Sequence, residues 1–199
     1  MVGVVYYKKF VILGGMGKIE LVEKIVIVPE QSTPRKRMFL SNIDLSLVVY
    51  QDSVSFFDPP STQMSFSEVC NKLYRALSKM LMQYDFMAGR LVPSLEDTQR
   101  FEIDCNGAGI VVASARTDRK LSEFGVISAP NPELKELVVF LHEGCGQETD
   151  LKEKPLASLQ VNVPFSSLKL MFSRLNVFDP YLNFLFVLIL LIIFIRLYS

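Results

Sequence analysis

The most regular hydrophobic pattern in the chain lies between Ser65 and Leu91 and predicts a long amphipathic helix. Its apolar residues recur in steps of three and four, the spacing that places side chains on one helical face. They are Phe66, Val69, Leu73, Leu77, Met80, Leu81 and Tyr84. Ser65 and Glu68 have the spacing of a capping box, so we expect the helix to begin at this serine. Gly89 is expected to adopt the left-handed conformation of a turn that ends the stretch.

Short runs of β-branched and aromatic residues on either side of this helix predict strands. The predicted strands cover residues 18–28, 45–50, 54–57, 100–105, 110–115, 137–141 and 156–161. Asn106-Gly107 favours a tight turn, so the strands on either side of it are expected to form a hairpin. Residues 118–124 are expected to form a short helix or a turn. The long helix should therefore lie on a core that it forms with these strands.

The charge of the chain argues against one class of function. The chain has 21 basic and 21 acidic residues, so it lacks the net positive charge typical of a nucleic-acid-binding protein. The basic triplet Arg35-Lys36-Arg37 is therefore interpreted as a solvated turn rather than as a nucleic-acid or membrane patch. Two glycine-rich stretches, 14–18 and 107–109, lack the spacing of a phosphate-binding loop and of a dinucleotide-binding motif. We therefore expect no bound cofactor.

The end of the chain is far more apolar than the rest. Charges are dense up to Lys154 and sparse beyond it. Asp179 can cap a helix and Pro180 suits its first position, so a hydrophobic helix is predicted at residues 181–198. About a dozen apolar residues there favour membrane insertion by on the order of 4–7 kcal/mol, although the apolar run is shorter than an ordinary span. The pattern therefore favours a membrane-associated helix, with aggregation of an incomplete domain as the alternative.

The cysteines and the one histidine give no clear catalytic or metal site. Cys70, Cys105 and Cys145 are an odd number of cysteines without metal-ligand spacing, which is typical of reduced thiols in the cytosol. His142 and Cys145 could form a nucleophile pair or half of a metal site. No third partner is evident, and the alternative is a histidine on a surface loop. We therefore expect no metal.

Several segments match, in order along the chain, the motifs of one enzyme family. They are Val28-Pro29-Glu30, Thr33-Pro34, Leu40-Ser41-Asn42-Ile43-Asp44, residues 73–81, residues 84–91, residues 102–109, Pro155-Leu156 and Leu159-Gln160. On these residues the chain resembles the N-terminal half of the plant BAHD acyltransferases, the HxxxD-type enzymes that use acyl-CoA. The resemblance implies an α+β fold, a partial chloramphenicol-acetyltransferase-like domain with a mixed sheet packed by helices.

The resemblance also implies an activity. Enzymes of this family transfer an acyl group, for some members a hydroxycinnamoyl group, from a CoA thioester to an alcohol or an amine. The histidine of the HxxxD motif is their general base, its aspartate has a structural role, and a DFGWG motif near the C-terminus completes the channel. Acyl-CoA is thus the implied co-substrate, a small alcohol or amine the implied acceptor, and the cytoplasm the implied location.

The catalytic motifs of the family are missing from this sequence. His142 lies before the strand where the family's histidine belongs, and position 146 is glycine rather than aspartate. After Gln160 the family pattern would continue with a strand, a Cys-Gly-Gly-like turn and the HxxxD motif. The chain instead continues with Val-Asn-Val-Pro-Phe, which we interpret as translation of an unspliced intron. We therefore assign no catalytic, cofactor-binding or metal-binding residue.

These observations predict four parts of the chain and leave two functions open. The parts are a non-family extension at 1–15, a partial N-terminal acyltransferase domain at 16–160, an unrelated linker at 161–180 and the hydrophobic helix at 181–198. Translation is predicted to start at Met16. The first function is that of an acyl-CoA-dependent acyltransferase, truncated and inactive alone. The alternative is a non-catalytic, membrane-tethered fragment or binding partner.

Overall fold

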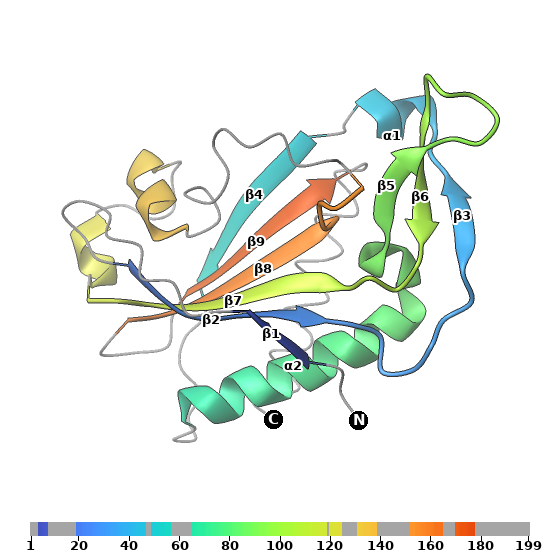
Figure 1. Cartoon of the computed structure of the whole chain (residues 1–199). Coiled ribbons are helices and arrows are strands. Elements are labelled where there is room, and N and C mark those ends of the chain that lie inside the picture. The colour runs from blue at the N-terminus through green and yellow to red at the C-terminus, as the bar shows by residue number, and fades with distance from the viewer. Residues whose placement is uncertain are drawn as a thin grey trace.

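The strands of the protein form two sheets. The computed structural model describes residues 4–7, 19–46, 49–56, 65–118, 120–124, 131–138, 152–164 and 170–177. The main sheet has six strands in the order β1-β2-β7-β8-β9-β4 (Figure 1). These are β1 (Val4–Tyr7), β2 (Ile19–Ile27), β4 (Val49–Phe56), β7 (Ile110–Thr117), β8 (Ala157–Pro164) and β9 (Leu170–Val177). All neighbouring pairs in it are antiparallel except β7 and β8, so the sheet is mixed.

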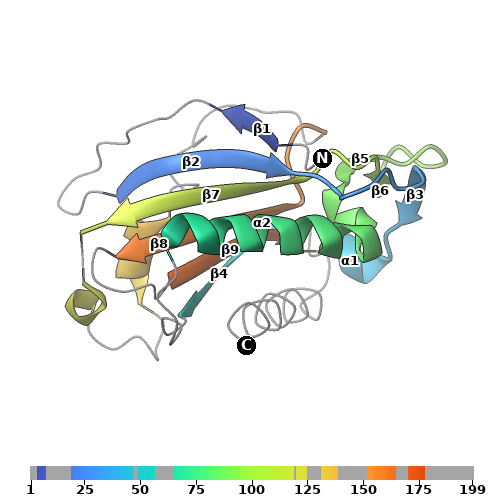
Figure 2. The same ribbon diagram turned by 90° about the horizontal axis from the view of Figure 1, so that it is seen from below.

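The predicted long helix is confirmed as α2 (Phe66–Gln83), which lies against one face of the main sheet (Figure 2). Its capping box is complete: the Ser65 amide donates to Glu68 Oε2 at 2.8 Å, and the Glu68 amide donates to Ser65 Oγ at 3.3 Å. Each of these bonds satisfies a backbone or cap group that the first helical turn leaves unpaired. The helix therefore begins where the sequence pattern predicted.

The core lies between α2 and the sheet. The predicted apolar face of α2 is buried at five positions, whereas Phe66 and Tyr84 at its ends are partly buried. Lys72, Arg75 and Lys79 are exposed on the opposite side. The sheet contributes Ile25, Ile27, Ile110, Val112, Ala157, Leu159 and Val161. A large apolar side chain that is fully buried contributes about 1.5–3 kcal/mol, so this layer is the main source of stability.

A smaller sheet of three strands, β3-β6-β5, lies beside the main one. It consists of β3 (Lys36–Phe39), β5 (Arg90–Pro93) and β6 (Phe101–Cys105), all antiparallel. Its own core consists of Leu40, Leu91, Ile103, Cys105 and Leu156. A short α1 (Asn42–Ser46) follows β3, and the 3-10 helix η1 (Asp85–Ala88) connects α2 to β5. Two further 3-10 helices, η2 (Leu121–Phe124) and η3 (Pro132–Leu137), follow β7.

The predicted hairpin around Asn106-Gly107 is wrong in its pairing. Both predicted strands exist, but β6 pairs with β3 and β5, whereas β7 pairs with β2 and β8. Residues 106–109 carry the chain from the small sheet to the main sheet. The positive φ expected at Gly107 is present, at 67°, and Gly109 also has a positive φ, of 90°. Local turn preference therefore identified the bend but not the partners of the two strands.

Three other local expectations also differ from the structure. Lys36 and Arg37 of the basic triplet belong to strand β3 instead of a turn, although all three basic residues are exposed as expected. The predicted strand at 45–50 is wrong in its first part, because residues 42–46 form α1, whereas β4 joins residues 49–56 into one strand. Leu137 ends η3 instead of starting a strand. Residues 139–141 lie outside the described part of the chain. The short helix expected within residues 118–124 is present as η2.

The segment after Gln160 contributes strands to the main sheet. Strand β8 continues to Pro164, and β9 lies between β8 and β4, antiparallel to both. The stretch expected to be a linker at 161–180 thus holds the end of β8 and the whole of β9. The hydrophobic helix expected at 181–198 lies outside the described residues. Within the described ranges, no helix is long and apolar enough to cross a membrane.

Candidate functional site

The motif segment 84–91 packs directly against the motif segment 102–109. Gly89 is not left-handed, contrary to expectation: its φ of −83° and ψ of −170° are those of extended backbone. Glycine is required here for space instead, because a Cβ atom would lie 2.6 Å from the Asp104 carbonyl oxygen and 2.7 Å from Ile103 Cγ2. The missing side chain lets η1 and β6 come into contact.

Arg90 joins the same two segments through backbone oxygens. Its Nη1 donates to the carbonyls of Gly89 and Gly109, each at 2.8 Å, and its Nη2 lies 3.5 Å from the Ala108 carbonyl. The Gly109 amide donates in turn to the Ala88 carbonyl at 2.9 Å. The guanidinium thus holds the crossing at 106–109 in place. Both glycine and arginine of this motif have structural roles in the described contacts.

The basic triplet is neutralised by acidic side chains of the small sheet and η1. Arg35 donates from Nε and Nη2 to the two Asp104 carboxylate oxygens at 3.0 and 2.6 Å. The other two ion pairs are Lys36 with Asp85 at 2.8 Å and Arg37 with Glu102 at 3.5 Å. The hydrogen bonds from Arg35 lower the pKa of Asp104 below its ordinary value. The triplet is therefore paired with the acidic residues beside it and is not a free basic patch.

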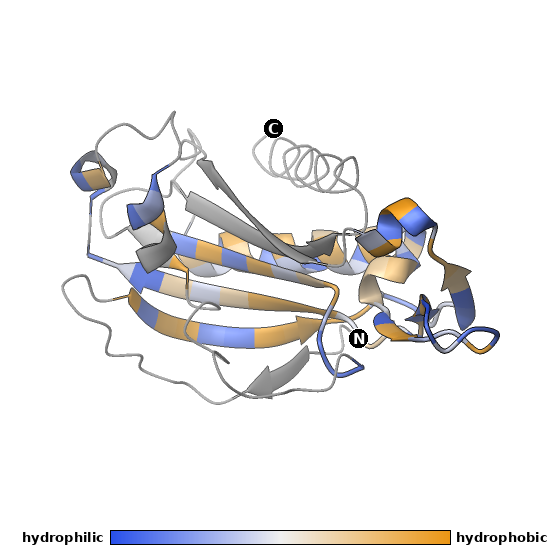
Figure 3. Ribbon diagram, turned by 90° about the horizontal axis from the view of Figure 1, so that it is seen from above, coloured by the Kyte–Doolittle hydropathy of each residue, from blue (hydrophilic) through white to orange (hydrophobic). Residues whose placement is uncertain are grey.

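A row of buried polar side chains lies on β8, at the end of the region that resembles the family. Ala157, Leu159 and Val161 point toward α2, so the alternate residues point to the opposite face of the sheet. These alternate residues, which we call the β8 polar row, are Ser158, Gln160 and Asn162, and all are buried. Figure 3 shows hydrophobic and polar residues in alternation along the coloured part of β8.

The two amides of the β8 polar row contact each other. Gln160 Nε2 donates to Asn162 Oδ1 at 2.6 Å, and both side chains are 0% exposed. Their neighbours on β7 are Ala113 and Ala115, whose short side chains leave room for the amides. Buried amides are costly unless hydrogen-bonded, so this row is a candidate functional feature. Amides can orient a ligand or another residue, but they do not take up a proton near neutral pH.

The β8 polar row was not predicted from the sequence. The pattern Ser158-x-Gln160-x-Asn162 was visible, but alternation of this kind usually indicates a strand with one solvated face. The structure buries both faces, which the sequence pattern alone does not reveal.

A second polar cluster lies on the α2 side of the sheet. Tyr74 Oη donates to Glu23 Oε2 at 3.1 Å, and Cys70 lies one helical turn before Tyr74. Burial raises the pKa of Cys70 to about 12 and also raises the pKa of Tyr74. A thiol with such a pKa stays protonated at neutral pH and is a poor nucleophile. This cluster is therefore part of the core.

One pocket of about 300 Å³ lies at the turn between β2 and β3. It is lined by Val28, Pro29, Glu30, Gln31, Ser32, Thr33, Asn106 and Gly107. Its volume is at the lower end of the range for small-molecule sites, and Glu30 is its one titratable side chain. The pocket therefore offers little chemistry for acyl transfer.

His142 and Cys145, considered above as a nucleophile pair, half of a metal site or residues of a surface loop, lie outside the described residues. Among the residues that the structure does describe, no group of three potential ligands could hold a metal ion. Cys70 and Cys105 are buried free thiols.

The fold and its motif contacts define a two-sheet α+β domain, and comparison with known proteins shows its relationship. The model of the Transferase family matches residues 17–163. An acyltransferase of Arabidopsis thaliana, GLAUCE, is 38% identical over 122 residues, covering 61% of this chain and 27% of that protein. A hydroxycinnamoyltransferase of Narcissus pseudonarcissus is 35% identical over 144 residues, covering 72% of this chain and 31% of that protein.

A solved structure has a similar fold. Vinorine synthase superposes with a TM-score of 0.62 and 20% identity, covering 79% of this chain and 38% of that one. The chain therefore belongs to the Transferase family, whose matching members here are plant BAHD acyltransferases. It spans only about three-tenths of the length of the curated relatives it matches, 27% and 31% for the two named above.

Proposed function

We propose that this chain supplies the N-terminal part of an acyl-CoA-dependent acyltransferase. The observation that supports this proposal is the family match over residues 17–163, which coincides with a fold organised by the family motifs. Arg90 and Gly89 hold two of these motif segments together. Because these contacts are structural, the motifs can be retained in a chain that lacks the catalytic histidine motif.

The reaction proposed for the whole protein is attack of an acceptor hydroxyl or amine on the thioester carbonyl of acyl-CoA. The new C–O or C–N bond forms, the C–S bond breaks, CoA leaves as the thiol, and a base takes the acceptor proton. Strand β9 follows β8 in the place where the family's histidine motif is expected. Its sequence, Leu170–Val177, contains no histidine and no aspartate. We therefore propose that this chain does not catalyse the reaction alone.

The acyl group proposed is of the hydroxycinnamoyl type. The relatives include a hydroxycinnamoyltransferase of Narcissus pseudonarcissus and a shikimate O-hydroxycinnamoyltransferase of Nicotiana tabacum, each 35% identical to this chain. We propose a cytoplasmic location, which suits the buried free thiols Cys70 and Cys105. The membrane-tethered alternative rests on residues 181–198 alone, and no described residue supports it.

The proposal is tested with a hybrid enzyme. Residues 1–163 of this chain are joined to the part of the Narcissus pseudonarcissus hydroxycinnamoyltransferase that follows the matched region. The hybrid is incubated with p-coumaroyl-CoA and three acceptors taken from the names of relatives: shikimate, anthranilate and omega-hydroxypalmitate. CoA release is followed with a thiol reagent, and the acylated product is identified by mass spectrometry.

The matched control is the same hybrid with the histidine of its HxxxD motif replaced by alanine. The proposal predicts acylated product from the hybrid and none from the control. Circular dichroism and thermal unfolding establish that both are folded. A folded hybrid that releases no more CoA than its control with any acceptor would show that this chain does not supply a functional acyltransferase part.

A further inference from the structure

Strand β1 lies outside the family match and before Met16, so it is present only in a chain that is translated from Met1. The match begins at residue 17, whereas β1 comprises Val4–Tyr7. It pairs antiparallel with β2 and occupies the outer edge of the main sheet (Figure 1). The extension at residues 1–15 therefore adds a strand beside β2. The strand on the other side of β2, β7, lies within the matched region.

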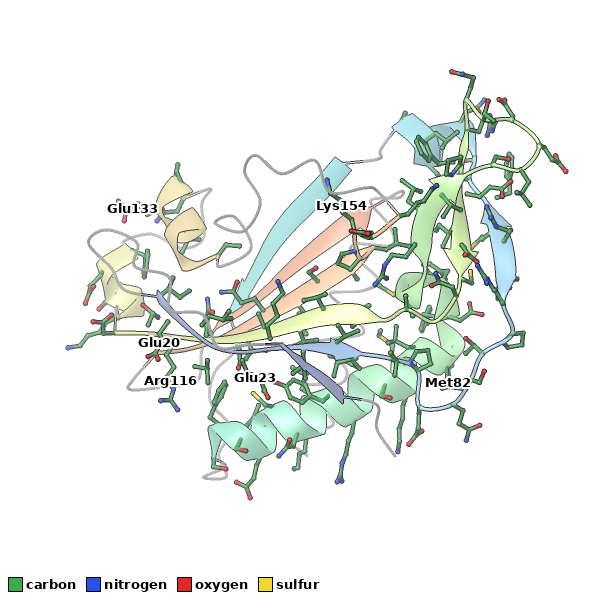
Figure 4. All side chains as sticks on the ribbon, viewed as in Figure 1. Glu20, Glu23, Met82, Arg116, Glu133 and Lys154 are labelled. Atoms are coloured by element: carbon green, nitrogen blue, oxygen red, sulfur yellow. The ribbon has the colours of Figure 1, made fainter. Side chains whose placement is uncertain are left out.

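The two halves of β2 differ in how well they resist pairing with another strand. In the first half, a register shift between Leu21 and Glu23 interrupts the regular ladder with β7. Glu20 is exposed there and Glu23 is partly exposed (Figure 4). Bulges and charged side chains are the usual features that protect a sheet edge from aggregation.

The second half of β2 has no such protection beyond one lysine. Residues 24–27 read Lys-Ile-Val-Ile and pair in regular register with β7. A regular, β-branched edge of this kind is a template for a further strand. The register of β1 covers this half and no more: Val4 lies opposite Ile27, and Tyr7 lies opposite Lys24.

We propose that β1 covers the edge of β2 and prevents a second copy of the chain from pairing through residues 24–27 of this strand. A second copy is the expected occupant because this edge accepts an antiparallel strand, as β1 shows, and a second copy presents the same regular edge at residues 24–27. Two such edges can pair with each other around a two-fold axis, with Lys24 opposite the partner's Ile27 and Ile25 opposite the partner's Val26. This contact is self-complementary, as the interface of a two-fold dimer must be.

The short connection between β1 and β2 favours pairing of β1 with β2 over pairing of β2 with a second copy. Residues 8–18 join β1 to β2 within one chain, and short connections give effective concentrations on the order of millimolar. If both strands bind the edge of β2 equally well, β1 therefore outcompetes a second copy at micromolar concentration by about a thousandfold. Removal of β1 cancels this advantage, and self-association through the edge then follows.

The test compares the full chain with a variant that begins at Met16, by sedimentation velocity across the micromolar range. The full chain is expected to sediment as a monomer. The variant is expected to approach twice the monomer mass, and a synthetic peptide of residues 1–15 is expected to return it toward the monomer. A folded variant that stays monomeric throughout, or a full chain that dimerises equally, would overturn the proposal.

Two proline variants keep the proposal testable if the shortened chain fails to fold. Successive backbone amides of an edge strand point alternately toward the neighbouring strand and away from it. One of Val5→Pro and Tyr6→Pro therefore removes a hydrogen bond to β2, and the other removes an outward amide that edge strands can lose. One variant should dimerise and the other should resemble the full chain. Two monomeric variants, or two that dimerise equally, would overturn the proposal.

Discussion

Replacement of Gly89 by alanine is expected to destabilise the protein, although glycine-to-alanine changes in extended backbone usually stabilise it. At a φ of −83° alanine has no backbone strain, and the reduced entropy of the unfolded chain favours it by about 0.4–1 kcal/mol. The new methyl group, however, would lie 2.6 Å from the Asp104 carbonyl oxygen, 2.7 Å from Ile103 Cγ2 and 2.9 Å from the Phe86 carbonyl oxygen. Two of these three atoms are backbone atoms that cannot rotate away.

The magnitude follows from these opposing terms. Overpacking of this kind costs about 1–3 kcal/mol and sometimes more, so it outweighs the entropic gain. We expect a net loss of about 1–2 kcal/mol, which lowers the urea midpoint by about 1 M for an m value of about 1–3 kcal/mol/M. Urea unfolding, monitored by circular dichroism, measures this shift of the midpoint.

Gly107→Asn is the matched control. Gly107 has a φ of 67°, but a Cβ atom there meets only Thr33 Oγ1 at 3.9 Å, and asparagine tolerates this backbone region. Gly107→Asn should lower the free energy of unfolding by less than about 1 kcal/mol. If Gly89→Ala were as stable as the unmodified chain, or no less stable than Gly107→Asn, the close approach of η1 to β6 would not explain the motif glycine.

Three further predictions concern the ion pair and the core. Arg35 lowers the pKa of Asp104 in the folded protein. The contribution of this carboxylate to stability is therefore present above the ordinary carboxyl pKa and is lost as pH falls through the folded-state pKa. Asp104→Asn should flatten the pH dependence of the free energy of unfolding between about pH 5 and about pH 2. Cys70, with a pKa of about 12, should resist iodoacetamide at pH 8 until urea unfolds the chain, as peptide mapping would show. Leu77→Ala should cost about 2–5 kcal/mol, because Leu77 is 0% exposed, whereas Lys79→Ala on the exposed side should change stability by less than about 0.5 kcal/mol in the same urea experiment.

The parts of the fold that sequence predicted well are those determined by local interactions. Helix α2 is determined by its capping box and its apolar spacing, which involve residues within a turn or two of one another. Strands β2, β6, β7 and β8 were recognised from their composition, close to their observed bounds. For the same reason, the positive φ of Gly107 could be anticipated from Asn106-Gly107.

The errors arise where distant residues decide the outcome. The hairpin prediction failed because β6 and β7 each pair with strands that are distant in the sequence and lie in different sheets. Arg90 contacts the crossing at residues 106–109 through the Gly109 and Ala108 carbonyls. The role of Gly89 depends on the approach of Asp104, which no local pattern encodes.

The candidate site was missed for a related reason. Gln160 and Asn162 belong to a strand with polar and apolar residues in alternation, and only the tertiary structure shows that both of its faces are buried.

Whether the chain alone turns over acyl-CoA tests the proposed function directly. The full chain is incubated with p-coumaroyl-CoA and the three acceptors, beside a His142→Ala variant, because His142 is the one histidine of the sequence. Both are expected to release CoA only at the rate of the buffer blank, because the described carboxylates of the motif segments 84–91 and 102–109 are ion-paired with the basic triplet. Acceptor-dependent CoA release by the chain that is lost in His142→Ala would contradict this expectation and would make His142 the catalytic base.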